Sequence, residues 1–196
     1  MSRGRSSVWR AKDEILERDL RYQIIKHDDP KLGAIRDLEI GDLYDDVADL
    51  AVSSAIPIEI ARQFDVARNA YIYSFFEYEL ATLAEEHAFA VLEMAVKRRT
   101  KDTNDPKTPG RGLTNCLEFA LSRGWLSIAD LTYKRAGEDC SLMEDLAAAR
   151  NGLAHGDFHL SPQFVVEILK ITKNLLEKIF AAPSRLGDGP STEQAD

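Results

Sequence analysis

A long run of the chain, residues 57 to 99, contains no glycine, and no proline after its first position. Those two residues are the strongest signals for turns and helix ends, so their absence favours continuous helix. Apolar residues recur along the run at steps of three and four, the spacing of one face of a helix. They are Ile60, Phe64, Ala67, Tyr71, Phe75, Tyr78, Leu80, Ala84, Ala88, Val91 and Ala95. Because the run exceeds the usual length of a globular helix, it predicts one bent helix or two consecutive helices.

Segments on both sides of this run also predict helices. Each has apolar residues at helical spacing, and the sequence SLME is typical of a capping box that starts a helix. The predicted helices cover residues 12–26, 41–54, 112–123 and 127–136, a segment from 141 into the sequence RNGLAHG, and 161–180. The alternation of apolar and polar residues that marks half-buried strands is not seen. The predicted fold class is therefore all-α, an up-and-down helical bundle with an N-terminal helical extension.

Composition divides the chain into four parts. Residues 1–10 are polar and predict a flexible N-terminus, and residues 11–56 predict the helical extension, whose second half is strongly acidic. Residues 57–182 predict the main helical domain. Residues 183–196 are poor in apolar side chains and predict a disordered tail.

The charge and the cysteine content exclude several classes of protein. A net charge of -8 argues against a basic surface for non-specific nucleic-acid binding. Cys116 and Cys140 form no CxxC pair and support neither a disulfide framework nor a zinc site. No apolar run is long enough to cross a membrane, and the basic N-terminus lacks the apolar segment of a signal peptide. We therefore expect a soluble, cytoplasmic protein with no membrane partner.

Arg150, Asn151 and His155 are the residues that most strongly indicate chemistry. Asn151 and His155 are four apart and share a face while the helix continues, and Gly156 suits the position just after a helix end. Histidine titrates near neutral pH and can move the proton of a ribose hydroxyl or of a leaving group. The arginine fork can stabilise charge that develops on a phosphate. This set therefore predicts cleavage of a phosphodiester without a metal.

A structural explanation of the same residues stays open. A histidine in the last turn of a helix is favoured by the helix dipole alone. An arginine followed by asparagine and glycine near a helix end is also compatible with surface and capping roles. Spacing by itself fits both interpretations.

The sequence RNGLAH, residues 150–155, resembles the Arg-polar-x(3–5)-His signature of the HEPN superfamily, with no departure from the pattern. The segment 67–99 is similar to the long helix of bacterial HEPN-like proteins, and an amphipathic helix follows the motif as it does in the family. The resemblance covers roughly residues 57–181. It implies a helical bundle of the HEPN type, and the first fifty residues lie outside it.

The resemblance also implies an activity. Active members of the family are metal-independent endoribonucleases that leave 2′,3′-cyclic phosphate ends. They work as homodimers in which two motifs form one site, with His155 as general acid or base, Arg150 on the phosphate and Asn151 in a positioning role. Many are toxins of toxin–antitoxin or antiphage systems, so RNA, a second copy and an antitoxin protein are the expected partners, with no cofactor. Other members keep the fold as a non-catalytic interaction or regulatory module, which stands as the alternative.

Acidic and histidine residues outside the motif are candidates for auxiliary roles. Some members of the family have an acidic residue on the long helix that assists the motif, and Glu85 or Glu93 could match it. The alternative for Glu85 and Glu86 is a solvent-facing acidic pair. His159 lies close to the motif in sequence and is a second candidate, or simply a loop histidine.

A basic run provides candidate RNA-binding residues, Lys97, Arg98, Arg99 and Lys101. They can hold phosphates by charge if they flank the motif, and a solvated helix end is the equal alternative. No histidine has a glutamate three residues before it, so the Glu-x-x-His pairs of di-iron helical proteins are absent. We therefore predict no metal site.

Overall fold

The computed structural model describes residues 10–29, 33–135, 138–155 and 162–181. At residues 29, 133–135, 138–139 and 149–155 the description covers the backbone and not the side chains.

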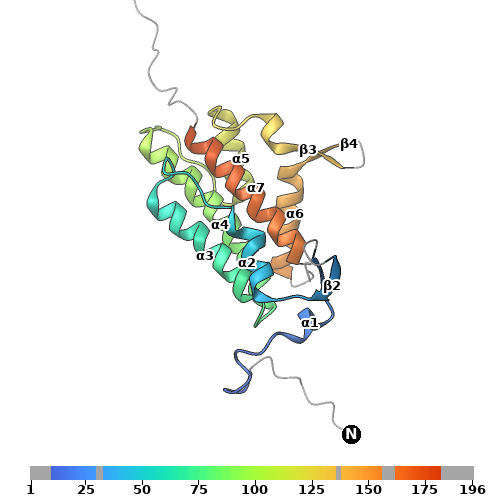
Figure 1. The fold of residues 1–196 in the computed structure, drawn as a ribbon. Coiled ribbons are helices and arrows are strands. Elements are labelled where there is room, and N and C mark those ends of the chain that lie inside the picture. Colours follow the sequence, from blue (N-terminus) through green and yellow to red (C-terminus); the bar gives the residue numbers. More distant parts are fainter. Residues whose placement is uncertain (1–9, 30–32, 136–137, 156–161, 182–196) are drawn as a thin grey trace, which may run out of the picture.

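Helices dominate the described residues, and five of them form the body of the molecule (Figure 1). They are α3 (Ile58–Tyr73), α4 (Glu79–Asp102), α5 (Leu113–Ser122), α6 (Leu142–His155) and α7 (Pro162–Ala181). Shorter elements are α1 (Leu20–Gln23), α2 (Ile40–Ala48) and a 3-10 helix, η1 (Ile128–Leu131). The prediction of a mostly helical fold is confirmed.

The long apolar run forms two helices, which is one of the two predicted alternatives. α3 ends at Tyr73 and α4 begins at Glu79. Ser74 caps the end of α3, and its hydroxyl donates a hydrogen bond to the carbonyl of Tyr71 at 2.6 Å. The turn between the two helices is rich in aromatic side chains, and Phe75 packs edge-on against its neighbour Phe76. The chain therefore reverses direction in a compact aromatic turn.

α4 is the central helix, and it packs against α3, α5, α6 and α7. Small buried residues, Ala84, Ala88 and Ala95, allow neighbouring helices to approach it closely, while Phe89 and Leu92 fill the remaining space. This is the wide apolar surface expected of a helix contacted from several sides.

Two antiparallel hairpins interrupt the helical architecture, and no strand was predicted. In the first, β1 (Lys26–Asp29) pairs with β2 (Ala34–Asp37). In the second, β3 (Thr132–Arg135) pairs with β4 (Glu138–Ser141). The predicted helix 127–136 is therefore wrong beyond its first turn, because only η1 is helical and β3 follows it directly.

The predicted N-terminal helix 12–26 is also wrong over most of its length, because only α1 is helical. An isolated helix gains most of its stability by burying an apolar face, and here Leu16, Leu20 and Ile24 remain exposed. Residues 10–29 and 33–38 instead form an irregular segment, the N-terminal arm, which contains α1, β1 and β2.

The two ends of the bundle carry different features (Figure 1). α6 ends where α4 and α7 begin, and the N-terminal arm lies at this same end, which we call the motif end. The last turn of α4 and the loop before α5 lie at the opposite end, the far end. None of the described helices is long and apolar enough to cross a membrane.

Candidate active site

α6 carries all three residues of the predicted catalytic set. Its backbone is helical through His155, so Asn151 and His155 lie one turn apart on the same face, and Arg150 directly precedes Asn151. The side chains of these three residues, and the whole of His159, lie outside the described residues. The described backbone thus brings the three motif residues together on one helix.

The start of α6 is fixed by its cap and by its buried side chains. The hydroxyl of Ser141 accepts a hydrogen bond from the backbone N–H of Glu144 at 3.3 Å, which is the serine half of the predicted capping box. Leu142 and Leu146 are buried in the core, and α6 packs on α4 and α5. These contacts fix the first half of α6 to the bundle.

Glu85 of α4 is buried completely, so the interpretation of Glu85 and Glu86 as a solvent-facing pair is wrong for Glu85. Neither of its carboxylate oxygens has a hydrogen-bond partner among the described side chains. Burial, and secondly the charge of Glu86, raise the pKa of Glu85 to about 7. The position of Glu85 between the apolar residues Ala81 and Ala88 in the helical pattern was a usable signal for this burial. A carboxyl of this kind can exchange a proton near neutral pH.

Glu93, the other acidic residue considered for an auxiliary role, has an ionic partner on its own helix. Its carboxylate lies 3.5 Å from the ammonium of Lys97, one turn later. The two acidic candidates on α4 are therefore in different states: Glu85 is buried without a described partner, and Glu93 belongs to an ion pair.

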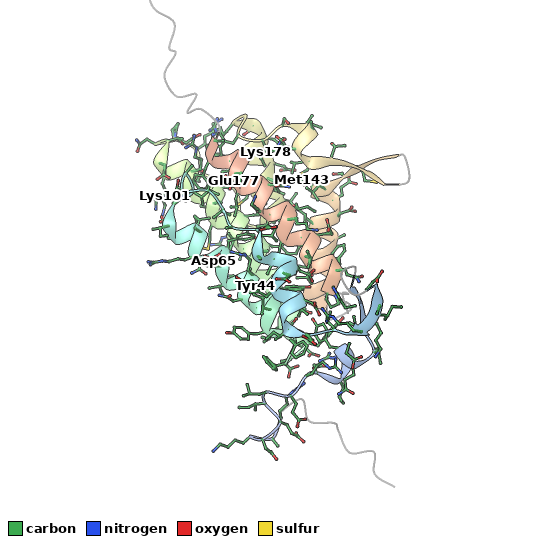
Figure 2. All side chains as sticks on the ribbon, viewed as in Figure 1. Tyr44, Asp65, Lys101, Met143, Glu177 and Lys178 are labelled. Carbon is green, nitrogen blue, oxygen red and sulfur yellow. The ribbon has the colours of Figure 1, made fainter. Side chains whose placement is uncertain are left out.

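The basic run lies at the far end of the bundle, away from the end of α6 (Figure 1). Arg98 pairs with Glu59 of α3, and its Nε donates to Asp102 at 2.8 Å. Lys101 is exposed at the same end (Figure 2). Within one chain, the structure therefore does not place the candidate RNA-binding residues beside the motif.

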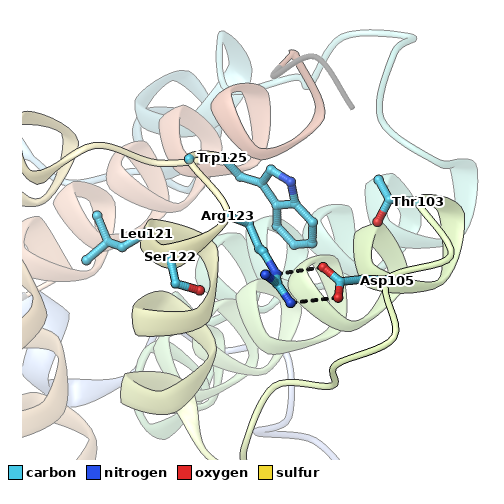
Figure 3. A pocket seen from close by; sticks show the side chains of 7 residues that line it. Thr103, Asp105, Leu121, Ser122, Arg123 and Trp125 are labelled. Atoms are coloured by element: carbon cyan, nitrogen blue, oxygen red, sulfur yellow. Dashed lines mark hydrogen bonds and ion pairs between the residues drawn. The ribbon is translucent and has the colours of Figure 1, made fainter. Parts of the chain in front are cut away.

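A pocket of about 320 Å³ at the far end contains an ion pair that the sequence did not indicate (Figure 3). Arg123 holds the nearly buried carboxylate of Asp105 with nitrogen–oxygen distances of 2.6 and 2.7 Å. The guanidinium also lies over the ring of Phe119, 4.9 Å from its centroid. These contacts tie the loop after α4 to the end of α5, so they explain Arg123 as a structural clamp.

A larger cavity, about 520 Å³, lies between α6 and α7. Its apolar lining comprises Leu142, Leu146, Phe164, Ile168, Ile171 and Leu175. Asp130 and Lys178 form an ion pair on its polar margin. The volume is within the range of small-molecule sites, roughly 300–1,000 Å³. The local sequence carries no signal for a gap between these two helices.

Three carboxylates at the motif end, Asp19, Glu77 and Glu79, lie within 4.8 Å of one another, a spacing compatible with metal ligands. Two arginines already pair with them. Arg21 contacts Asp19 at 3.0 Å and also binds Glu79, and Arg10 contacts Asp19 at 3.1 Å. The cluster therefore acts as an ionic clamp that holds the N-terminal arm to the turn between α3 and α4.

The pKa values of the clamp follow from these contacts. Burial alone would raise the pKa of Asp19, but hydrogen bonds from the side chain and backbone of Arg21 and from the backbone of Tyr78 outweigh it and hold the pKa far below its ordinary value. The hydrogen bonds from Arg21 lower the pKa of Glu79 to about 2. Burial, followed by the hydrogen bond to Glu79, raises the pKa of Glu77. At neutral pH the clamp is held mainly by the anions Asp19 and Glu79 and by two guanidinium groups.

Comparison of the chain with protein-family models, with curated proteins and with solved structures gave no match.

Proposed function

We propose that this chain is a metal-independent endoribonuclease of the HEPN type, a toxin or stress effector that cleaves RNA as a homodimer. The observation that carries the proposal is the placement of Arg150, Asn151 and His155 together on α6, a helix that packs on α4 and α5. The order of helices, with a long central helix before the motif and an amphipathic helix after it, is compatible with the family.

The roles follow from the chemistry of each side chain. His155 takes the proton of the ribose 2′-hydroxyl, or gives one to the leaving 5′-oxygen. The 2′-oxygen then bonds to phosphorus as the bond to the 5′-oxygen breaks, so the products carry a 2′,3′-cyclic phosphate and a 5′-hydroxyl. Arg150 stabilises the negative charge on the phosphoryl oxygens, and Asn151 positions the imidazole or the ribose.

Glu85 is the auxiliary residue that the geometry supports best. It belongs to α4, against which α6 packs, and its carboxyl titrates near neutral pH because it is buried. A group of this kind is suited to orient or protonate a neighbour on α6. Glu93 is a weaker candidate, since its charge is already paired with Lys97.

The position of the basic run limits its role in this proposal. α4 is about 36 Å long at the usual rise per residue, and the run occupies the end of α4 that is far from the motif. Lys97, Arg98, Arg99 and Lys101 of one chain would therefore contact parts of the RNA several nucleotides away from the cleaved bond.

The test is cleavage of a fluorescent RNA by the wild-type protein and by Arg150→Ala and His155→Ala, in the presence of EDTA. We expect each substitution to lower the rate by roughly 10²–10⁴-fold, with cyclic phosphate ends in the wild-type products. His27→Ala, a histidine on the β1–β2 hairpin, is the matched control and should cleave normally. Equal cleavage by the wild type and all three variants, or loss of activity in EDTA, would contradict the proposal.

A non-catalytic binding module is the second candidate, and the cavity beside α6 favours it. An apolar site of about 520 Å³ next to the helix that carries the motif is suited to bind a ligand or a partner side chain. Expression in cells separates the two functions. A ribonuclease should slow growth, and His155→Ala should relieve this effect, whereas a binding module should be harmless in both forms.

A further inference from the structure

The cavity of about 520 Å³ between α6 and α7 follows from the way the bundle is assembled. Each of the two helices packs mainly on other partners: α6 on α4 and α5, and α7 on α4 and α3. At one margin of the cavity, Lys178 of α7 forms an ion pair with Asp130 of η1, which joins the end of α7 to the segment before α6. The cavity is thus bounded by well-packed helices on its sides and by an ion pair at this margin.

The walls of the cavity are apolar and recessed. Leu142 and Leu146 of α6 line it together with Ile168 and Leu175 of α7, and all four side chains are buried. None of the large apolar side chains that are exposed in the described part of the chain belongs to this lining. Exposed apolar patches mark protein–protein sites, whereas recessed apolar cavities of this volume are typical of small-molecule sites. The walls therefore favour the apolar body of a small molecule over the surface of a protein partner.

The margin of the cavity is more acidic than basic. Asp130, Asp145 and Glu167 contribute carboxylates, and Lys178 is the one basic residue of the described lining. The ammonium of Lys178 is bound to Asp130. Lys170, outside the lining, contacts Glu167 at 2.8 Å, but both of these side chains are about half exposed, so water weakens their attraction. The margin, like the whole chain with its net charge of -8, therefore attracts a cation and repels an anion.

We propose that the cavity between α6 and α7 binds a small organic cation, an amine with an apolar body. The body would contact the apolar walls, and the ammonium would lie at the margin, where the carboxylates attract it and the side-chain oxygen of Asn174 can accept a hydrogen bond. The site goes beyond the proposed RNA cleavage and does not require it. It gives the alternative binding function a class of ligand.

A ligand in this cavity would contact two helices at once. Leu142 and Leu146 belong to α6, and the same helix carries the motif further along. Binding stabilises the state that contains the complete site. Amide hydrogen exchange in the first half of α6 should therefore slow when the amine is added, and unchanged exchange at a saturating concentration would contradict the proposal.

The direct test uses three probes of the same size and different charge: phenylbutylamine, phenylbutanol and phenylbutanoate. Their binding to the full-length wild type is measured by calorimetry at low and at high salt. At low salt we expect the amine to bind roughly fivefold more tightly than the alcohol and the carboxylate to bind most weakly, and high salt should bring the three affinities together. An amine that binds no better than the alcohol overturns the proposal. No binding of any probe also overturns it, and leaves a side chain of a partner protein as the occupant.

Matched variants separate the acidic margin from the apolar walls. Asp145→Asn/Glu167→Gln should abolish the preference for the amine and keep the affinity for the alcohol. Glu144→Gln, on an exposed residue of α6 outside the described lining, is the control and should keep the preference. Ile171→Trp fills the cavity from its wall and should weaken all three probes tenfold or more, whereas Val66→Trp, half exposed on α3, should not. A double variant that still prefers the amine contradicts the role of the carboxylates.

NMR of the wild type locates the site without any variant. Addition of phenylbutylamine should shift the amide signals of residues 142–146 and 164–175, and shifts confined to other parts of the chain overturn the proposal. RNA cleavage is measured separately on the same protein. Binding of the amine by a protein that cleaves no RNA would refute the proposed ribonuclease and leave the ligand site intact, and cleavage by a protein that binds no probe would do the reverse.

Discussion

The bundle and the N-terminal arm of this protein are held by different forces. Phe64, Leu92 and Leu169 are fully buried in the bundle, where close packing of apolar side chains dominates. The arm places Tyr22 and Leu38 into that core and depends otherwise on the ionic clamp around Asp19. The difference teaches that two parts of one chain can respond to salt and acid to different degrees, and we expect the arm to respond more strongly than the bundle.

The largest expected effect is a cavity in the bundle. Leu169→Ala removes a fully buried side chain of α7 and should lower the free energy of unfolding by about 2–5 kcal/mol. Denaturant unfolding followed by circular dichroism measures it. A loss below about 1 kcal/mol would mean that the core is looser than its burial suggests.

Removal of the central anion of the clamp should free the arm and leave the bundle folded. Asp19→Ala removes the nearer of the two carboxylates that Arg10 and Arg21 share, together with two backbone contacts, so the arm should lose about 2–3 kcal/mol of local stability. Hydrogen exchange of the arm should accelerate, while exchange in α4 and α7 stays near the wild-type value. Glu17→Ala, an exposed carboxylate in the same segment, is the control and should change neither.

The clamp also gives the arm an acid limit. The folded pKa values of Asp19 and Glu79 lie below their ordinary values, so these groups stabilise the arm fully above the ordinary range. That stabilisation is lost as the pH falls from about 4.5 towards the pKa of Glu79, about 2. In a titration followed by NMR, signals of the arm should therefore change before those of α4. Simultaneous loss of both sets of signals would contradict the separation of the two regions.

Glu85 should give the bundle the opposite dependence on pH. Its folded pKa, about 7, lies above its ordinary value of 4.5, so its protonated form favours the folded state. Stability is highest below the ordinary value and falls as the pH rises through 7. Glu85→Gln should therefore raise the free energy of unfolding on the order of 1–2 kcal/mol at pH 8, with little gain at pH 4.5. Glu86→Gln, on the exposed neighbour, should have a smaller effect in the same direction, because it removes only the second cause of the raised pKa of Glu85. If Glu85 assists the motif, the stabilised variant should also cleave RNA more slowly.

The smallest expected effect is the loss of an ion pair on the bundle surface. Lys178→Ala removes the partner of Asp130, but Asp130 keeps its hydrogen bonds to Ser127. We expect a change below about 1 kcal/mol, which salt should reduce further. A larger loss would show that the cavity between α6 and α7 depends on this pair for its shape.

The sequence predicted the bundle better than the arm, for physical reasons. Helices α3, α4 and α7 were predictable because each buries a stripe of apolar residues at regular spacing. The same pattern at residues 12–26 misled, since Ile15, Leu16, Leu20 and Ile24 stay exposed in the part of the chain that the structure describes. The hairpins carry no alternating pattern in their strands, and their pairing depends on contacts between segments that a local pattern does not contain.

The same distinction holds for the candidate site: features marked by a local pattern could be predicted, and contacts between distant segments could not. The sequence signature predicted Arg150, Asn151 and His155 as site residues, and the structure shows that all three belong to α6. The spacing of alanines around Glu85 could have predicted its burial. The pair of Asp105 and Arg123 could not be predicted, because its partners come from a loop and a helix end that only the folded chain brings together. The distance of the basic run from the motif end likewise depends on the direction of α4 in the bundle (Figure 1).

The buried position of Tyr22 has a consequence for how the chain can be shortened. A fragment starting at residue 57 would retain α3 to α7 but lack Tyr22, and with it Leu43 and Val47 of α2, all three of which are buried in the common core. The aromatic turn after Ser74 would then be open to water, and such a fragment should aggregate or bind the dye ANS. Trimming that preserves the native state should instead stop before Arg10, the first residue of the ionic clamp.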